Sequence, residues 1–141
     1  MADGNSQVTT GDGYAVVGSL DALGDGPGFR KIRTPLGVNA FGVNAIVMPA
    51  GIGSGAHYHD VQEELYFVHR GAIEIEFGDG SVHTLREGGL ARVDAGTVRT
   101  LRNVGDSEAI YLCVGGKDGY VGRDGRVPPG EEERVRALHA K

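Results

Sequence analysis

Apolar and polar positions alternate along much of the chain in short runs that are separated by glycine, a pattern typical of antiparallel β-strands. The clearest run is AIEIEF (72–77), in which three apolar side chains share one face of a strand and two glutamates share the other. The Asp-Gly pair in the following GDGS (78–81) favours a hairpin turn. This stretch therefore predicts two strands joined by a tight turn.

Further strands are predicted wherever short apolar runs lie between glycine-rich or Asp-containing gaps. These runs are 14–20, 29–33, 38–48, 64–68, 82–85, 90–93, 98–103 and 109–116. Short strands at such spacing predict an all-β sandwich or small barrel, here over residues 14–116. Residues 1–13 are expected to form a loose N-terminal leader, and residues 117–141 a tail.

The end of the chain is the only part with a helical pattern. Residues 131–141 begin with three glutamates and finish with arginine, histidine and lysine. Negative charge at the start and positive charge at the end complement the dipole of a helix. The sequence therefore predicts a short C-terminal helix.

Composition places the 141-residue chain among ordinary single-domain proteins, with 40% hydrophobic residues, 23% charged residues and a formal net charge of −5. There is no basic field to attract nucleic acid and no apolar stretch long enough to span a bilayer, so neither is an expected partner. No signal peptide is visible, and the single cysteine, Cys113, fits a reducing compartment. The expected location is the cytoplasm.

Candidate chemistry is concentrated in HYHDVQEELYFVHRG (57–71). His57 and His59 are two positions apart, so both imidazoles project from the same face of an extended strand. If the next strand returns alongside, Glu64 and Tyr66 share one of its faces. Imidazole and carboxylate groups are common ligands of transition metals. The alternative is a polar surface turn that contains histidines.

The spacing of glycines around these residues resembles the first motif of the cupin superfamily. Gly51 is followed by five residues, the His57-Tyr58-His59 triplet, four residues, Glu64, six residues and Gly71. Glu63 also fits the variable gap, but only Glu64 leaves six residues before the second glycine. The resemblance implies an antiparallel double-stranded β-helix, the jelly-roll or cupin barrel.

The second cupin motif is matched in part. Gly88, Gly96 and Asn103 occupy their expected places, whereas Asp94 stands where proline is usual. Arg99 stands where the family places its fourth metal ligand, and a guanidinium cannot ligate a metal because it does not lose its proton. The resemblance covers residues 51–103.

Two arrangements of the site follow from the resemblance. In the first, His57, His59 and Glu64 bind one divalent transition metal (Fe, Mn, Ni, Cu or Zn), while Arg99 and Tyr66 contact a small-molecule substrate. Arg99 would hold its carboxylate, and Tyr66 is either a proton donor or a plain lining aromatic. In the second, Glu64 pairs with Arg99 beside neutral histidines and no metal binds.

The expected function is that of a small metalloenzyme of the oxygenase, isomerase or lyase type, acting on an oxygenated or carboxylate-bearing molecule. The alternative is a non-catalytic cupin that binds or senses a small ligand without metal. The resemblance also implies a homodimer formed through an outer sheet face. The segment GYVGRDGR (119–126) is expected to be a surface turn, and no chemistry is assigned to it.

Overall fold

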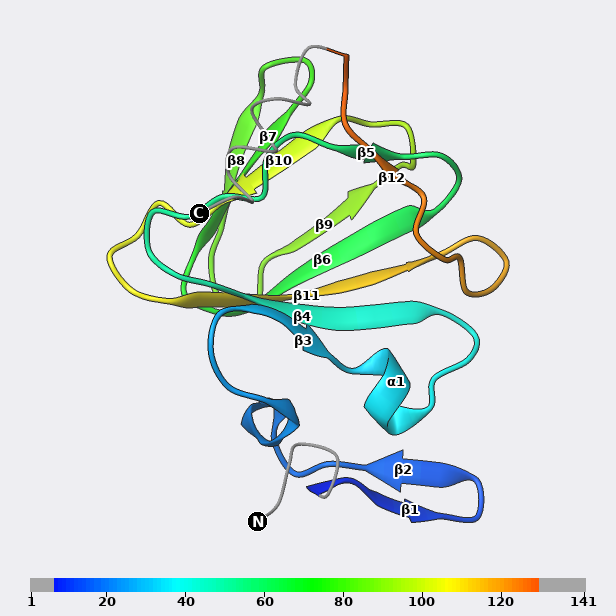
Figure 1. The fold of residues 1–141 in the computed structure, drawn as a ribbon. Coiled ribbons are helices and arrows are strands. Elements are labelled where there is room, and N and C mark those ends of the chain that lie inside the picture. Colours follow the sequence, from blue (N-terminus) through cyan, green and yellow to red (C-terminus); the bar gives the residue numbers. More distant parts are fainter. Residues whose placement is uncertain (1–6, 130–141) are drawn as a thin grey trace.

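Two antiparallel sheets that face each other form the body of the protein (Figure 1). The computed structural model describes residues 7–129. The larger sheet has five strands in the order β3-β4-β11-β6-β9. Their bounds are β3 (Gly28–Lys31), β4 (Gly42–Met48), β11 (Ala109–Gly116), β6 (Glu63–Arg70) and β9 (Leu90–Val93).

The smaller sheet has three strands in the order β10-β7-β8. Their bounds are β10 (Arg99–Arg102), β7 (Ile73–Phe77) and β8 (Val82–Leu85). The segment before β5 (Tyr58–His59) is attached to β10 by two isolated bridges, Gly53 to Arg102 and His57 to Arg99. The first histidine of the candidate site therefore lies beside β10, opposite the larger sheet.

The core lies between the two sheets because each contributes the apolar side of its alternating pattern. Tyr66 and Val68 of β6 point inward from the larger sheet, and Ile73, Ile75 and Leu101 from the smaller one. All five side chains are at most 2% exposed. The glutamates of β7 are on its other face, as the period of two predicts.

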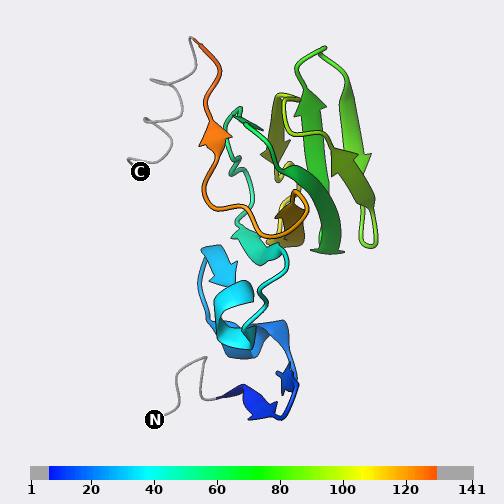
Figure 2. The same cartoon turned by 90° about the vertical axis from the view of Figure 1, so that its right-hand side faces the viewer.

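Two short helices near the N-terminus cover part of the outer face of the larger sheet (Figure 2). They are the 3-10 helix η2 (Leu20–Leu23) and α1 (Arg33–Leu36), and the paired strands β1 (Thr9–Gly11) and β2 (Tyr14–Val16) lie beyond them. Leu20 and Ile32 pack on a second buried cluster formed by Ala45, Val47 and Ile110. This packing shields the β4 side of that outer face from solvent.

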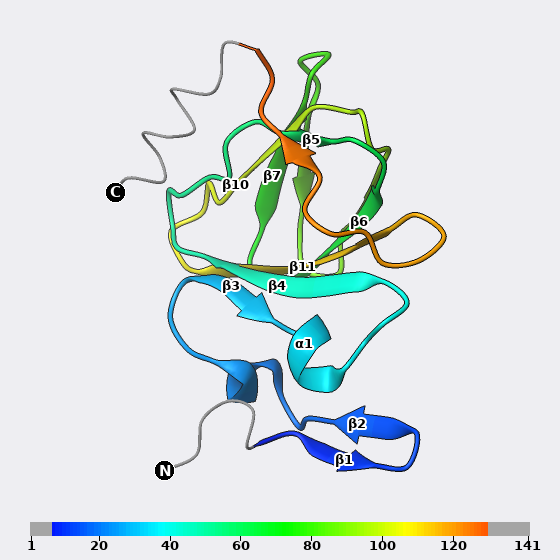
Figure 3. The ribbon, with the colours of Figure 1, turned by 45° about the vertical axis from the view of Figure 1, so that its right-hand side comes forward.

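Three local predictions need correction. Residues 9–11, placed in the loose leader, form β1 and pair with β2, because Asp12 and Gly13 provide the same Asp-Gly turn that was used to predict the hairpin after β7. The strand predicted over 29–33 ends at Lys31, and α1 begins at Arg33, the last residue of that predicted strand. The predicted tail contains β12 (Gly125–Arg126), which pairs with β5 (Figure 3).

The predicted all-β cupin fold is confirmed, with strands 82–85, 90–93 and 109–116 at their predicted bounds. Between residues 7 and 129 the strands form separate facing sheets and not one continuous closed barrel. The helix predicted for 131–141 lies outside the described residues. None of the helices in the described part of the chain is long and apolar enough to cross a membrane.

Two glycines of the cupin motifs allow a stability test. Both have positive φ, 77° at Gly71 and 84° at Gly88. An added Cβ at Gly71 would lie 3.0 Å from the Cα and Cβ of Ala109, whereas one at Gly88 would meet nothing within 4 Å. Gly88→Ala should lower the free energy of unfolding by about 1–2 kcal/mol through backbone strain alone. Gly71→Ala should lower it by about 1–3 kcal/mol more, because the methyl group overpacks this contact.

Chemical denaturation of the two variants and the wild type measures both effects. Equal losses of stability would mean that β11 moves away from Gly71 freely, contrary to the rigid contact described.

Candidate metal centre

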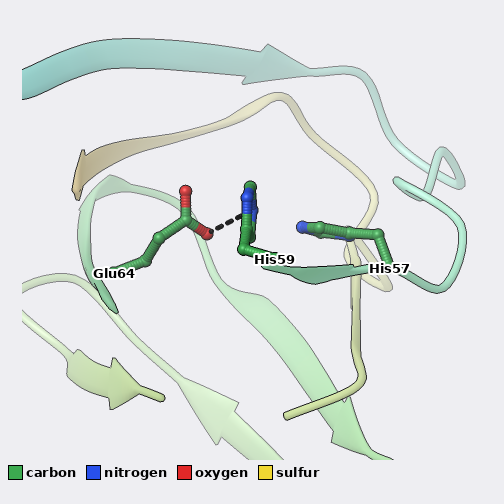
Figure 4. Close-up of side chains that lie close together, drawn as sticks. All are labelled: His57, His59 and Glu64. Atoms are coloured by element: carbon green, nitrogen blue, oxygen red, sulfur yellow. Dashed lines mark ion pairs between the residues drawn. The ribbon is translucent and has the colours of Figure 1, made fainter. Parts of the chain in front are cut away.

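Three potential ligands from consecutive segments meet between the sheets (Figure 4). His57 lies just before β5, His59 lies within it, and Glu64 is on β6. Their ligating atoms all lie within 4.8 Å of one another, and Nε2 of His59 is 3.2 Å from Oε1 of Glu64. The structure therefore brings together the three residues that the sequence predicts as metal ligands.

Backbone hydrogen bonds fix the strand that carries the two histidines. The N–H of His57 donates to the carbonyl of Arg99 at 3.0 Å, and the N–H of Arg99 donates back at 2.9 Å. The N–H of His59 donates to the carbonyl of Ala95 at 2.7 Å. Because the chain is extended between them, both rings turn to the same side, with their centroids 5.4 Å apart.

Both carboxylate oxygens of Glu64 accept hydrogen bonds from neighbouring side chains. Its Oε1 accepts a hydrogen bond from the hydroxyl of Tyr66 at 2.5 Å and from Nη2 of Arg99 at 2.7 Å. Its Oε2 accepts from the thiol of Cys113 at 3.1 Å. Burial by itself would raise the pKa of Glu64, but the hydrogen bonds from His59, Tyr66, Arg99 and Cys113 outweigh it and hold the pKa well below the ordinary value. Glu64 is therefore an ionised carboxylate.

Arg99 is completely buried, with a side chain that is 0% exposed. Its Nε donates to the hydroxyl of Tyr66 at 3.2 Å, and its Nη2 donates to Glu64. Its Nη1 donates to backbone carbonyls of the turn before β10, those of Asp94, Ala95 and Thr97. All three nitrogens are thus committed to protein acceptors, which is the Glu64–Arg99 pairing of the second arrangement considered from the sequence.

Asp124 is a member of the site that sequence reasoning missed. Its Oδ1 lies 2.7 Å from Nδ1 of His59, although the two residues are 65 positions apart in the chain. Asp124 belongs to the segment 119–126, which was expected to be a surface turn without a chemical role. The Asp-Gly pair at 124–125 indicated a turn, but nothing in the sequence indicated what this turn would contact.

The two histidines have opposite electrostatic environments. Burial, followed by the charge of Arg99, lowers the pKa of His57, so its imidazole is neutral and able to ligate. Burial also opposes the charged form of His59, but its hydrogen bonds with Glu64 and Asp124 outweigh this and raise the pKa. With a carboxylate at each ring nitrogen, the space between Nε2 and Glu64 favours a positive charge, which can be a proton or a metal ion.

The separations of the ligand atoms are close to those in a coordination sphere. Metal–nitrogen and metal–oxygen bonds of about 2.1 Å place neighbouring ligand atoms about 3.0–3.4 Å apart and opposite ones about 4.2 Å apart. The 3.2 Å between His59 and Glu64 fits neighbouring ligands of one ion. All other separations are within 4.8 Å, so a small ring movement would complete the site. The donor set therefore fits a divalent transition metal.

The remaining polar side chains take no direct part in this cluster of ligands. Tyr66 lies between the sheets, only 2% exposed, with its hydroxyl between Glu64 and Arg99. Cys113 packs against the main core and also donates to Glu64. His69 and His83 are exposed.

Solved structures with the same fold give an independent comparison. A sugar phosphate isomerase of the cupin superfamily from Silicibacter pomeroyi is 30% identical, with a TM-score of 0.60 over 72% of this chain and 66% of its own. A double-stranded β-helix protein from Klebsiella pneumoniae is 22% identical, with a TM-score of 0.66 over 79% and 89% of the two chains. The DMSP lyase DddQ from Ruegeria pomeroyi is 23% identical, with a TM-score of 0.57 over 65% and 46%.

The chain thus spans about two thirds of the isomerase and less than half of the lyase. A search of curated proteins finds no match. The sequence model of the family described as "Cupin domain" matches residues 44–115, a range that includes His57, His59, Glu64 and Arg99. The chain therefore belongs to the cupin superfamily.

Proposed function

We propose that the protein is a small metal-dependent cupin enzyme of the oxygenase, isomerase or lyase type, acting on a small oxygenated or carboxylate-bearing molecule. The observation that carries this proposal is the position of His59, whose Nε2 lies 3.2 Å from Glu64 while its Nδ1 lies 2.7 Å from Asp124. This arrangement orients one ring nitrogen toward the space between the ligands. His57 completes a set of two imidazoles and one carboxylate.

A divalent ion held by His57, His59 and Glu64 would supply Lewis acidity toward a substrate oxygen. Arg99 and Tyr66 act on Glu64, because both donate hydrogen bonds to its Oε1 and keep it ionised and in place. Every guanidinium nitrogen of Arg99 already donates to a protein acceptor. For Arg99 to contact a substrate carboxylate, as predicted, that carboxylate must replace one of these acceptors. Glu64 is the acceptor with matching chemistry, so ligand binding and the position of Glu64 are coupled.

Among the three reaction types, isomerisation has the support of a relative. The sugar phosphate isomerase from Silicibacter pomeroyi shares 30% of aligned residues with this chain. Proton transfer next to a carbonyl is a reaction that a cation near the carbonyl oxygen facilitates, and it needs no external oxidant. A substrate with adjacent carbonyl and hydroxyl groups is therefore the first class to assay.

A second candidate, a cupin that binds a small ligand without metal or turnover, is favoured by one observation. Arg99 and Glu64 are paired at 2.7 Å, and the guanidinium is buried beside the candidate ligands. A fixed positive charge opposes a divalent ion nearby in a medium of low polarity. Metal analysis decides between the two candidates.

The protein purified without chelator should contain one divalent transition metal per chain. The double variant His57→Ala, His59→Ala should lose it, because one carboxylate alone cannot hold such an ion against a competing chelator. Elemental analysis by mass spectrometry measures the content. The variant His69→Ala is the matched control, since this histidine is exposed on the opposite face of β6.

Full metal content in the double variant would show that other residues bind the ion. Metal-free wild type that takes up no ion on titration would favour the non-catalytic candidate.

Position 99 provides a second test, because Arg99 is the bridge partner of His57. Bridge partners project to the same side, about 4.5–5.5 Å apart at Cβ, so Arg99→His should add a fourth ligand beside His57. Arg99→Ala removes the same guanidinium without adding a ligand and is the matched control. Both variants should lose stability, because Glu64 loses its buried partner. In chelator competition, Arg99→His should bind metal more tightly than Arg99→Ala.

Equal metal affinity in the two variants would show that position 99 does not reach the ion. Comparing the variants with each other, and not only with the wild type, separates ligation from the loss of positive charge.

We also infer a homodimer that uses the outer face of the larger sheet. Leu112, Phe67 and Leu90 lie side by side in register across β11, β6 and β9, and Leu65 is in the next row. Leu65 is 41% exposed and Leu90 59%, whereas Leu20 and Ile32 cover the same face around Ala45, Val47 and Ile110. An apolar sheet face of this kind is typical of a protein contact.

The double variant Leu65→Asp, Leu90→Asp should therefore have the mass of a monomer in light scattering at micromolar concentration, where the wild type has that of a dimer. Val82→Asp on β8, which changes a side chain that is 49% exposed on the smaller sheet, is the control and should remain dimeric. A monomeric wild type would refute the inference.

A further inference from the structure

The segment that follows β11 returns across the candidate metal centre. After Gly116 the chain turns tightly, with the N–H of Lys117 donating to the carbonyl of Gly119 at 2.9 Å. β12 then pairs with β5, so that Gly125 lies opposite His59 (Figure 3). We call residues 120–127 the strap. It lies alongside the short strand that carries His59.

Asp124 is the residue through which the strap reaches the site. Its Oδ2 accepts hydrogen bonds from the backbone N–H groups of Val61 at 2.9 Å and Gln62 at 3.1 Å. Its Oδ1 accepts from the side-chain amide of Gln62 at 2.6 Å and lies 2.7 Å from Nδ1 of His59. Four protein groups thus surround one carboxylate.

The glutamine in this cluster is itself held in place. An added Cβ on Gly115 would lie 2.3 Å from Oε1 of Gln62, so the amide lies directly against the backbone of β11. Because Oε1 of Gln62 lies against Gly115, the amide nitrogen of Gln62 points to Asp124. The carboxylate is therefore held by the β5–β6 connection, which rests on β11, and not only by the adjacent β12.

The hydrogen-bond partners determine which nitrogen of His59 carries a proton. Each of the other three partners of Asp124 can only donate, so Asp124 acts as an acceptor throughout. Nδ1 of His59 must then be the donor, and its proton is held on the side away from Glu64. In the neutral ring this leaves the lone pair on Nε2, which faces Glu64.

We propose that Asp124 is the positioning residue of the metal centre: it fixes the ring of His59 with Nε2 toward the ion, so that closure of the strap and metal binding stabilise each other. This inference rests on the proposed metal site. The two effects are thermodynamically linked. The free energy by which the closed strap strengthens metal binding equals the free energy by which the bound metal stabilises the closed strap. Outer carboxylates of this kind commonly strengthen metal binding by histidine.

The variant Asp124→Asn tests the proposal with little change of volume. One carboxylate oxygen becomes an amide nitrogen, which must then face one of the N–H donors and cannot accept from it. The dissociation constant for Zn²⁺ alone, measured by competition with a chromophoric chelator, should rise about 10- to 100-fold. The variant Arg126→Ala is the matched control. It removes the ion pair with Asp60 that joins the same two strands but leaves Asp124 and His59 untouched, so its affinity should stay close to that of the wild type.

A second measurement needs no change in the sequence. Binding of Zn²⁺ to the wild type should slow the amide hydrogen exchange of Val61 and Gln62, whose N–H groups donate to Asp124. The same ion should have little effect on these amides in Asp124→Asn.

The outcomes separate the two hypotheses. Equal Zn²⁺ affinity in Asp124→Asn and the wild type, or unchanged exchange of the two amides on metal binding, would overturn the role of Asp124 while leaving the metal site in place. A wild type that binds no Zn²⁺ would overturn both. An Arg126→Ala variant as weak as Asp124→Asn would show that strand pairing, and not the carboxylate on His59, determines affinity.

Discussion

The guanidinium of Arg99 lies between the two sheets with its side chain fully buried, and its charge has to be balanced by groups that the fold supplies. A buried charge without a partner is strongly destabilising, whereas a paired and fully hydrogen-bonded charge is tolerated. Glu64 of β6 provides the opposite charge, and the turn before β10 provides three carbonyls. The pair therefore connects the larger sheet to the smaller one.

This constraint extends to the rest of the site. Because Glu64 is ionised and held by Arg99 and Tyr66, the ring of His59 next to it lies against negative charge on one side. Asp124 adds negative charge on the other side, so that one imidazole stands between two carboxylates. Within residues 7–129 no buried side-chain nitrogen or oxygen lacks a hydrogen-bond partner. A local change at any member of this network therefore alters the charge balance of the others.

Most of the fold could be predicted from the sequence because its strands are short, regular and bounded by turn residues. The run 72–77 shows this well, since its alternation alone assigns the isoleucines to the core and the glutamates to the other face. Residues 9–11 were not recognised as a strand because TTG has no apolar side chain to show a period. The ligand triad could be predicted from local spacing, since His57, His59 and Glu64 lie within eight consecutive positions. Asp124 could not, because its position depends on a pairing between strands that are distant in the chain.

The pairing of β12 with β5 also affects the order in which the parts of the metal centre form during folding. β12 and β5 are joined through only two residue pairs, and 65 positions separate His59 from Asp124. Closing this long loop costs conformational entropy, and so short a pair of strands gives little stabilisation to offset it. Pairing of this kind forms late in folding and opens first in native fluctuations. On the ribosome, every strand of both sheets leaves the exit tunnel before Asp124 does. The strands of both sheets are therefore available to pair before Asp124 can reach His59.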